Sequence, residues 1–227
     1  MSKCFICEGD ISAQFSWTTL FSNETDVTCT DCEEKFAFIT GDTCPKCSRP
    51  QSDTTVCDDC KKWEVVEQYK GTLHRNISVF AYNDFMKEVL AQYKFRGDVA
   101  LAKVFQKQWV GAFKRYFPEN DLILVPIPLG KERLYERGFN QTFVLTEMLP
   151  GTIADILTKN ETVKQSKKSR YERLQTENSF EVIHPPSEKG IVLIDDIYTT
   201  GTTIRMAAKR LKEAGATEIS SFTLVRS

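Results

Sequence analysis

One segment near the end of the chain, residues 191–203, constrains the fold more than any other. It begins with an apolar run, Ile191 to Ile194, that has the length and β-branched content typical of a buried parallel strand. After it, apolar residues recur at the spacing of one helix face: Ile204, Ala207, Ala208 and Leu211. The segment therefore predicts a strand, a loop and a helix in succession, with the loop at the carboxyl end of the strand.

The predicted loop is rich in carboxylates and hydroxyls. In open α/β sheets, ligands bind at the carboxyl ends of the strands, and the N–H groups that begin the next helix attract a phosphate. Asp195 and Asp196 can accept hydrogen bonds from a cis-diol such as that of a ribose, and Gly201 lets the backbone approach an anion closely. The hydroxyl donors are Thr199, Thr200, Thr202 and Thr203. Helix capping explains one such residue but not the whole pattern, so we expect a ribose-phosphate site.

This segment resembles the signature of type I phosphoribosyltransferases, in which a hydrophobic run, two acidic residues and two hydrophobic residues precede a Thr- and Gly-rich phosphate loop. The resemblance implies that Asp195 and Asp196 hold the ribose of phosphoribosyl pyrophosphate, and that residues 199–203 hold its 5-phosphate. It also implies that Mg²⁺ bridges the diol and the pyrophosphate. A P-loop is excluded, because the chain has no Gly-x-x-x-x-Gly-Lys-Ser/Thr sequence.

All eight cysteines lie in the first 60 residues, as four Cys-x-x-Cys pairs. Two such pairs complete a tetrahedral zinc site, and coordination by four cysteines leaves no open position for catalysis. Disulfides are one alternative, but we find no secretory signal before Cys4 and expect a reducing compartment. A redox pair at Cys44 and Cys47 is another, and the fourfold repeat favours metal over it. The predicted ligands of two structural zinc sites are Cys4, Cys7, Cys29, Cys32, Cys44, Cys47, Cys57 and Cys60.

The cysteines also suggest the domain organisation. Sequential pairing would join the first four in one site and the last four in another, and interleaved pairing is the alternative. We expect residues 1–72 to form a double zinc-ribbon module that needs metal to fold, because so short a segment buries little apolar surface. Residues 73–227 are expected to form a phosphoribosyltransferase-like α/β domain.

Predicted strands and helices alternate through this second domain, which favours a parallel sheet flanked by helices. The strands are expected at 77–82, 122–126, 191–194 and 219–225, and the helices at 84–95, 98–117, 141–149 and after residue 203. The loop that follows the strand at 122–126 should meet the loop after Ile194 at one edge of the sheet. In type I phosphoribosyltransferases a loop in this place holds the pyrophosphate, for which the candidates are Pro128, Leu129, Lys131 and Arg133. Without that context, Pro126 and Pro128 would merely end a strand.

Charge and hydropathy set further limits. The chain has 30 Lys and Arg against 31 Asp and Glu, so net charge gives no argument for nucleic-acid binding. Residues 1–75 hold 8 basic and 13 acidic side chains, and the remainder holds 22 and 18, so an acidic first part precedes a basic second part. No run approaches the roughly 18 apolar residues of a membrane span. We therefore expect a cytoplasmic protein without membrane insertion, whose acidic ribbons have a protein partner rather than DNA.

Three further motifs make the resemblance more specific. They are residues 93–98, the loop at 125–129, and the run Arg137, Gly138, Phe139, Asn140 and Gln141. With the zinc ribbons and the diol loop, they are similar to the hallmarks of the ComF family over nearly the whole chain. The resemblance implies a bacterial protein required for DNA uptake in natural transformation, which works beside a competence helicase-like ATPase of the ComFA type.

The interval 159–175 holds six Lys and Arg against two Glu. In phosphoribosyltransferases a flexible hood occupies this interval, here expected at about 159–181, and its basic residues would neutralise the leaving group. The same run could follow the backbone of single-stranded DNA, with Tyr171 stacking on a base, or could be only a solvated loop. The candidate residues are Lys164, Lys167, Lys168, Arg170 and Arg173.

Three functions remain open from the sequence. The first is a competence protein that binds phosphoribosyl pyrophosphate with Mg²⁺ and single-stranded DNA. The second is an active phosphoribosyltransferase, with Asp195, Asp196 and Lys131 as its catalytic residues, although no nucleobase pocket is evident. The third is a non-catalytic zinc adaptor that docks the competence helicase.

Overall fold

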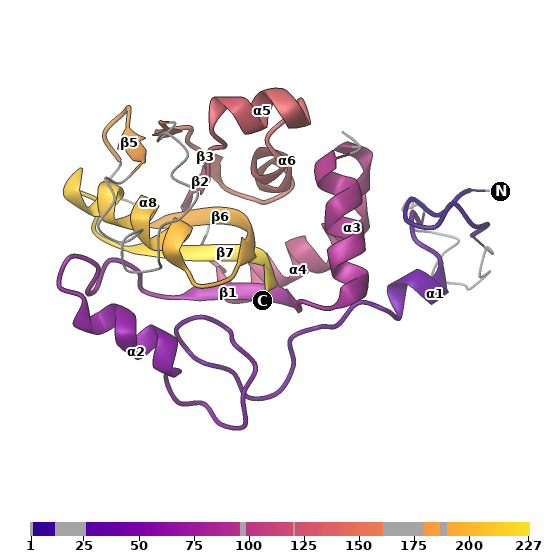
Figure 1. Ribbon diagram of the computed structural model, residues 1–227, viewed down its shortest axis with the longest axis horizontal. Helices are drawn as coiled ribbons and strands as arrows, with labels where there is room; N and C mark the ends of the chain where they lie inside the picture. Colours follow the sequence, from indigo (N-terminus) through magenta and orange to yellow (C-terminus); the bar gives the residue numbers. More distant parts are fainter. Residues whose placement is uncertain (1, 12–25, 96–98, 120, 161–178, 187–189) are drawn as a thin grey trace.

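The computed structural model describes residues 2–11, 26–95, 99–119, 121–160, 179–186 and 190–227 (Figure 1). Its centre is a five-stranded sheet in which all neighbouring strands run parallel, in the order β1-β7-β6-β2-β3. The strands are β1 (Asn76–Ala81), β2 (Ile123–Pro126), β3 (Thr152–Ile153), β6 (Ile191–Tyr198) and β7 (Ile219–Arg226). The predicted parallel sheet is confirmed.

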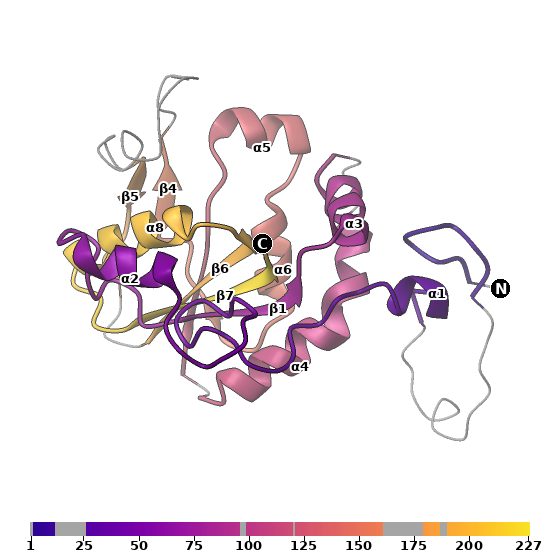
Figure 2. The ribbon, with the colours of Figure 1, turned by 60° about the horizontal axis from the view of Figure 1, so that its bottom comes forward.

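Helices cover both faces of this sheet (Figures 1 and 2). The helices of the described residues are α1 (Thr30–Glu33), α2 (Asp58–Val65), α3 (Asp84–Phe95), the 3₁₀ helix η1 (Val99–Phe105), α4 (Gln106–Tyr116), α5 (Lys131–Arg137), α6 (Gln141–Glu147) and α8 (Thr202–Glu213), of which α1 and α5 do not lie on the sheet. A separate antiparallel pair is formed by β4 (Leu157–Lys159) and β5 (Phe180–Val182). Among the described residues, no helix combines the length and the apolar character that crossing a bilayer requires.

The two faces of the sheet bury different cores. In β6, Val192 and Ile194 pack with α3, α4 and α6, whereas Ile191 and Leu193 pack with α8 and the second group of cysteines. This alternation follows from the two-residue period of a strand, and it explains why the run is apolar on both faces. The first face is rich in aromatic side chains, and Trp109 stacks on Phe222 with ring centroids 4.0 Å apart.

Several elements differ from the sequence prediction, among them the short strands β3, β4 and β5, which were not expected. The expected helix at 98–117 is two elements, η1 and α4, because the chain forms a 3₁₀ segment before the α-helix, as is frequent at helix N-termini. The strand expected at 191–194 continues to Tyr198, because its pairing with β7 continues to Arg226. Helix α5 was not expected, since none of its residues is buried and it has no apolar stripe.

The two cysteine-rich segments form similar turns at different places. Glu8 and Ser48, each directly after a Cys-x-x-Cys pair, have positive φ angles of 60° and 57°. The segment with the first cysteines ends in α1 and lies beyond α3, whereas the segment before α2 lies against the sheet (Figures 1 and 2). The predicted boundary at residue 72 falls just before β1, and independent folding of residues 1–72 stays a prediction.

Candidate functional site

The acid pair lies at the carboxyl end of β6. Asp195 pairs in register with Thr223 of β7, and the backbone N–H of Asp196 donates a hydrogen bond to the Asp195 carboxylate at 2.9 Å. Because successive side chains of a strand alternate, the two carboxylates face opposite sides of the sheet. Asp196 faces Lys94 of α3, whereas the charge of Lys159 at the end of β4 reaches Asp195.

Two lysines act on the carboxylates, and the charge of Lys94 reaches both of them. Lys94, near the end of α3, forms an ion pair with Asp196 in which both side chains are mostly buried. On the other side, Asp195 attracts Lys159 at the end of β4, where burial and the charge of Arg133 lower the lysine's pKa. Burial, together with the charge of Asp196, raises the pKa of Asp195 to about 8. The site therefore holds two acids that the protein partly neutralises before any ligand arrives.

The loop after β6 leads directly into α8. Thr199 and Thr200 are exposed, the Thr200 and Thr202 hydroxyls are 2.8 Å apart, and Thr203 is half-buried in the first turn of the helix. Gly201 has a φ of 79°, and a Cβ there would lie 2.2 Å from the Tyr198 hydroxyl, so no other residue fits. The N-terminus of a twelve-residue helix thus opens beside the acid pair, in the arrangement that binds phosphates.

The loop after β2 lies at the same edge, as expected. Pro126 of β2 pairs with Ile194, and the Ile127 N–H donates to the Ile194 carbonyl at 2.9 Å. Pro128 and Leu129 follow, half-buried. Lys131 and Arg133 are exposed in the first turn of α5, and the electrostatic influence of Arg133 reaches Lys159. The predicted pyrophosphate residues are therefore next to the acid pair, although their role stays a prediction.

The run from Arg137 to Gln141 forms the turn between α5 and α6. Gly138 ends α5 with a φ of 75°, and the Arg137 guanidinium donates to the Gln141 side chain at 3.0 Å. Asn140 caps α6 by accepting from the Thr142 N–H, and its amide donates to the Ile127 carbonyl at 3.2 Å. Through Asn140, the motif therefore connects the start of α6 to the loop after β2.

The cysteines form two groups in sequential order: Cys4, Cys7, Cys29 and Cys32, and then Cys44, Cys47, Cys57 and Cys60. Within each group, all sulfur atoms lie within 4.8 Å of one another, and the eight thiols are free. Tetrahedral zinc with Zn–S bonds of about 2.3 Å requires S···S separations of about 3.8 Å. The Cys7–Cys29 and Cys47–Cys57 sulfurs are both 3.7 Å apart, so both groups fit structural zinc.

Comparison with known proteins assigns the family. A model of the phosphoribosyl transferase domain matches residues 149–227. Competence protein ComFC of Bacillus subtilis (strain 168) is 43% identical over 99% of this chain and 95% of that protein. Competence protein ComFC of Streptococcus pneumoniae (strain ATCC BAA-255 / R6) is 38% identical over 99% of this chain and 100% of that protein. The chain belongs to the ComFC family of competence proteins.

More distant relatives match the ComFC-family chain over a shorter span. DNA utilization protein YhgH of Escherichia coli (strain K12) is 24% identical over 81% of this chain and 83% of that protein. The phosphoribosyl transferase match includes β6, the acid pair and the loop into α8, so the family signature and the site geometry fall in one segment. The resemblance to the ComF family that the sequence motifs indicated is confirmed.

Several predicted residues of this ComFC-family chain lie outside the described residues. They include Tyr171 and all five basic candidates of the hood: Lys164, Lys167, Lys168, Arg170 and Arg173. The described ends of the hood interval are β4 and β5, which pair antiparallel, with Thr158 opposite Glu181. The hood interval therefore begins and ends at a short two-stranded stem, and Lys159 at the end of β4 contributes to the site.

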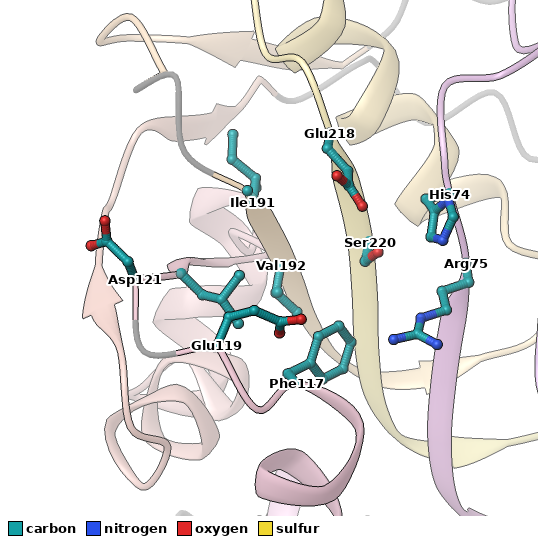
Figure 3. A pocket seen from close by; sticks show the side chains of 11 residues that line it. His74, Arg75, Phe117, Glu119, Asp121, Ile191, Val192, Glu218 and Ser220 are labelled. Atoms are coloured by element: carbon teal, nitrogen blue, oxygen red, sulfur yellow. The ribbon is translucent and has the colours of Figure 1, made fainter.

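A pocket of about 360 Å³ lies at the other edge of the ComFC-family sheet (Figure 3). Arg75, Ile191 and Glu218 line it at or just before the starts of β1, β6 and β7, and Phe117 closes one side. None of the predicted ligand-binding residues lines this pocket. It is separated from the acid pair by the length of the strands.

Three residues at the ComFC-family site were not found from sequence. Lys94 pairs with Asp196, and Trp63 and Arg226 contact the backbone of the phosphate loop. Lys94 lies in the motif at 93–98, which indicated the family but did not predict a function for this residue. Trp63 and Arg226 are ordinary core and strand residues by pattern, and only the tertiary fold brings them to the loop.

Proposed function

We propose that this ComFC-family protein binds phosphoribosyl pyrophosphate with Mg²⁺ during DNA uptake in the cytoplasm. The observation that carries the proposal is the placement of Asp195 and Asp196 beside the N-terminus of α8, at the edge where the loop after β2 also ends. Carboxylates accept hydrogen bonds from a ribose diol, and a helix N-terminus with threonine hydroxyls suits the 5-phosphate.

The remaining residues suit the pyrophosphate. Lys131 and Arg133 begin α5 directly after the loop that follows β2, the charge of Arg133 reaches Lys159, and all three offer positive charge to an anionic group. Mg²⁺ would bridge the diol and the pyrophosphate and so reduce the repulsion between the ligand and the acid pair. Turnover would need an acceptor, for which neither the sequence nor the geometry names a binding residue, so binding is proposed ahead of catalysis.

Calorimetric titration with magnesium phosphoribosyl pyrophosphate tests this function. We expect binding to the wild-type protein and its loss in the Asp195→Asn/Asp196→Asn variant. The matched control is Glu119→Gln/Glu218→Gln, which removes two carboxylates at the opposite edge of the sheet and should leave binding intact. Absence of binding to the wild type would refute the proposal, and release of pyrophosphate on incubation would show turnover.

A second function, binding of single-stranded DNA, is favoured by one exposed aromatic side chain. Tyr135 of α5 is 92% exposed, and Lys131 and Arg133 lie on the same short helix. Exposed aromatic rings beside cations stack on bases and hold the phosphate backbone. Docking of a ComFA-type helicase stays a prediction, since no described feature favours a particular surface for it.

Fluorescence anisotropy with a labelled oligonucleotide tests DNA binding. Replacing Tyr135 by Ala should weaken binding about tenfold, the effect of one lost stacking contact. Tyr116→Ala is the control, because this side chain is 40% exposed on α4, close to the opposite edge of the sheet. Equal effects of the two substitutions would remove α5 from the DNA-binding surface.

A further inference from the structure

The two Cys4 groups differ in their surroundings. All four thiols of the second group are buried, and they pack in one hydrophobic cluster with Tyr198 and Ile204, which flank the phosphate loop at residues 199–203. In the first group Cys7 is exposed, whereas Cys4 and Cys32 are buried and pack with the aromatic core on the other face of the sheet. Only the second group is therefore part of the structure beneath the phosphate loop.

Arg226 joins the second group to the phosphate loop. Its guanidinium is buried and lies over the Tyr198 ring at 5.2 Å. One nitrogen, Nη1, donates to the carbonyls of Tyr198 and Thr199 at 3.1 and 2.9 Å, and the other, Nη2, is 3.8 Å from the Cys47 sulfur. A single side chain at the end of β7 thus contacts both a predicted zinc ligand and the start of the loop.

Trp63 makes a second connection. It lies in α2, the helix that begins directly after Cys57 and contains Cys60. Its indole N–H donates to the Thr200 carbonyl at 2.9 Å, and Arg205 of α8 lies over its ring at 5.2 Å. The carbonyls of three successive residues, 198 to 200, are therefore held by side chains that surround the second group.

These bonds determine how the loop presents its N–H groups. In a trans peptide the C=O of one residue and the N–H of the next point in opposite directions. Holding the Thr199 and Thr200 carbonyls toward the second Cys4 group turns the N–H groups of Thr200 and Gly201 the other way. Four thiolates around Zn²⁺ keep a net negative charge, which suits the Arg226 cation, and they fix the start of α2.

We propose that Trp63 and Arg226 are positioning residues through which the second Cys4 group, with zinc bound, sets the conformation of the phosphate loop. The first group has no such role. The effect on ligand affinity rests on the proposed function, whereas the effect on loop conformation does not. Zinc at the second Cys4 group would therefore be required for the binding conformation of the phosphate loop, in addition to its contribution to stability.

Hydrogen–deuterium exchange of residues 198–203 in the full-length zinc-loaded protein tests the inference without any ligand. Replacing Trp63 by Phe should retain the zinc content and raise exchange in the loop about fivefold, the effect of one lost hydrogen bond. Arg226→Gln should raise exchange in the loop further. Arg226→Lys should give exchange between that of Arg226→Gln and that of the wild type. The control is Trp109→Phe, because the Trp109 indole also donates to a carbonyl at 2.9 Å, that of Leu145, away from the loop.

A comparison of the two Cys4 groups completes the test. Cys47→Ser should lose one zinc and raise exchange in the loop, whereas Cys7→Ser should lose one zinc and leave the loop unchanged. Unchanged loop exchange in the zinc-loaded Trp63→Phe and Arg226→Gln variants, or equal effects of the two cysteine variants, would overturn the inference. Calorimetry with magnesium phosphoribosyl pyrophosphate should show about fivefold weaker binding by Trp63→Phe. A wild-type protein that binds none would refute the proposed function alone.

Discussion

Lys94 of α3 forms an ion pair with Asp196 of β6, across the face of the sheet that α3 covers. Both side chains are mostly buried, so removing one partner leaves the other as an unpaired charge at low dielectric. We expect Lys94→Met to lower the free energy of unfolding by about 2 kcal/mol, and Lys94→Met/Asp196→Asn to recover part of that loss. Urea denaturation of the four proteins of this double-mutant cycle provides the measurement. Strictly additive effects would mean that the pair contributes nothing.

Ligand binding should depend on pH through Asp195. Its pKa is raised to about 8, and hydrogen bonds from a diol to the carboxylate favour the ionised form. We therefore expect affinity for magnesium phosphoribosyl pyrophosphate to rise between about pH 6 and pH 8, with more protons released than from the ligand alone. Calorimetry in two buffers of different ionisation enthalpy measures that release. Asp195→Asn should remove the excess, and equal release by both proteins would contradict the assignment.

The stability of the ligand-free protein should change in the opposite direction. An unfolded Asp has a pKa of about 3.9, so between that value and about 8 the folded state binds more protons than the unfolded state. The contribution of Asp195 is complete below about pH 4 and is lost as the pH rises through about 8. Thermal unfolding across this range should show a steeper loss of stability with rising pH in the wild type than in Asp195→Asn.

Gly201→Ala should destabilise the protein and abolish ligand binding. The added Cβ would meet the Tyr198 hydroxyl at 2.2 Å, and the φ of 79° is strained for any other residue, so a cost of about 3 kcal/mol is expected. Gly215→Ala separates the two causes, because Gly215 has a φ of 103° but no atom within 4 Å of its Cβ position. Chemical denaturation should show the smaller loss for Gly215→Ala. Combining Gly201→Ala with Tyr198→Phe should recover part of the stability.

Asn140 offers a test of the motif between α5 and α6. Asn140→Ala removes the helix cap and the bond to the Ile127 carbonyl, for an expected cost of about 2 kcal/mol. Asn140→Asp keeps an acceptor for the Thr142 N–H but cannot donate to Ile127. If the motif fixes the loop after β2, denaturation should show Asn140→Asp between the wild type and Asn140→Ala. Wild-type stability of Asn140→Asp would restrict the role of this residue to capping.

The sequence correctly predicted the features that depend on interactions between residues close together in the chain. Each of three such features lies within a short segment and is found in the structure: the apolar run of β6, the apolar stripe of α8 and the repeated Cys-x-x-Cys turns. Helix α5 was missed because it buries no residue. The bonds of Trp63 and Arg226 to the loop span 137 and 27 residues, and neither has a periodic signal. Residues that hold a binding loop in place without facing its ligand reach the loop only through the tertiary fold, and a single sequence does not identify them.

The position of β7 has a consequence for synthesis. This strand follows the others in the sequence, yet it lies between β1 and β6, and the Ser78 and Thr223 hydroxyls that join β1 to β7 are 145 residues apart in the chain. Until β7 has been synthesised, β1 and β6 each have an edge without its partner strand. Long-range parallel pairing is slow, and unpaired edges invite aggregation. The nascent chain is therefore most vulnerable before β7 emerges, while the strand that joins β1 to the rest of the sheet is still missing.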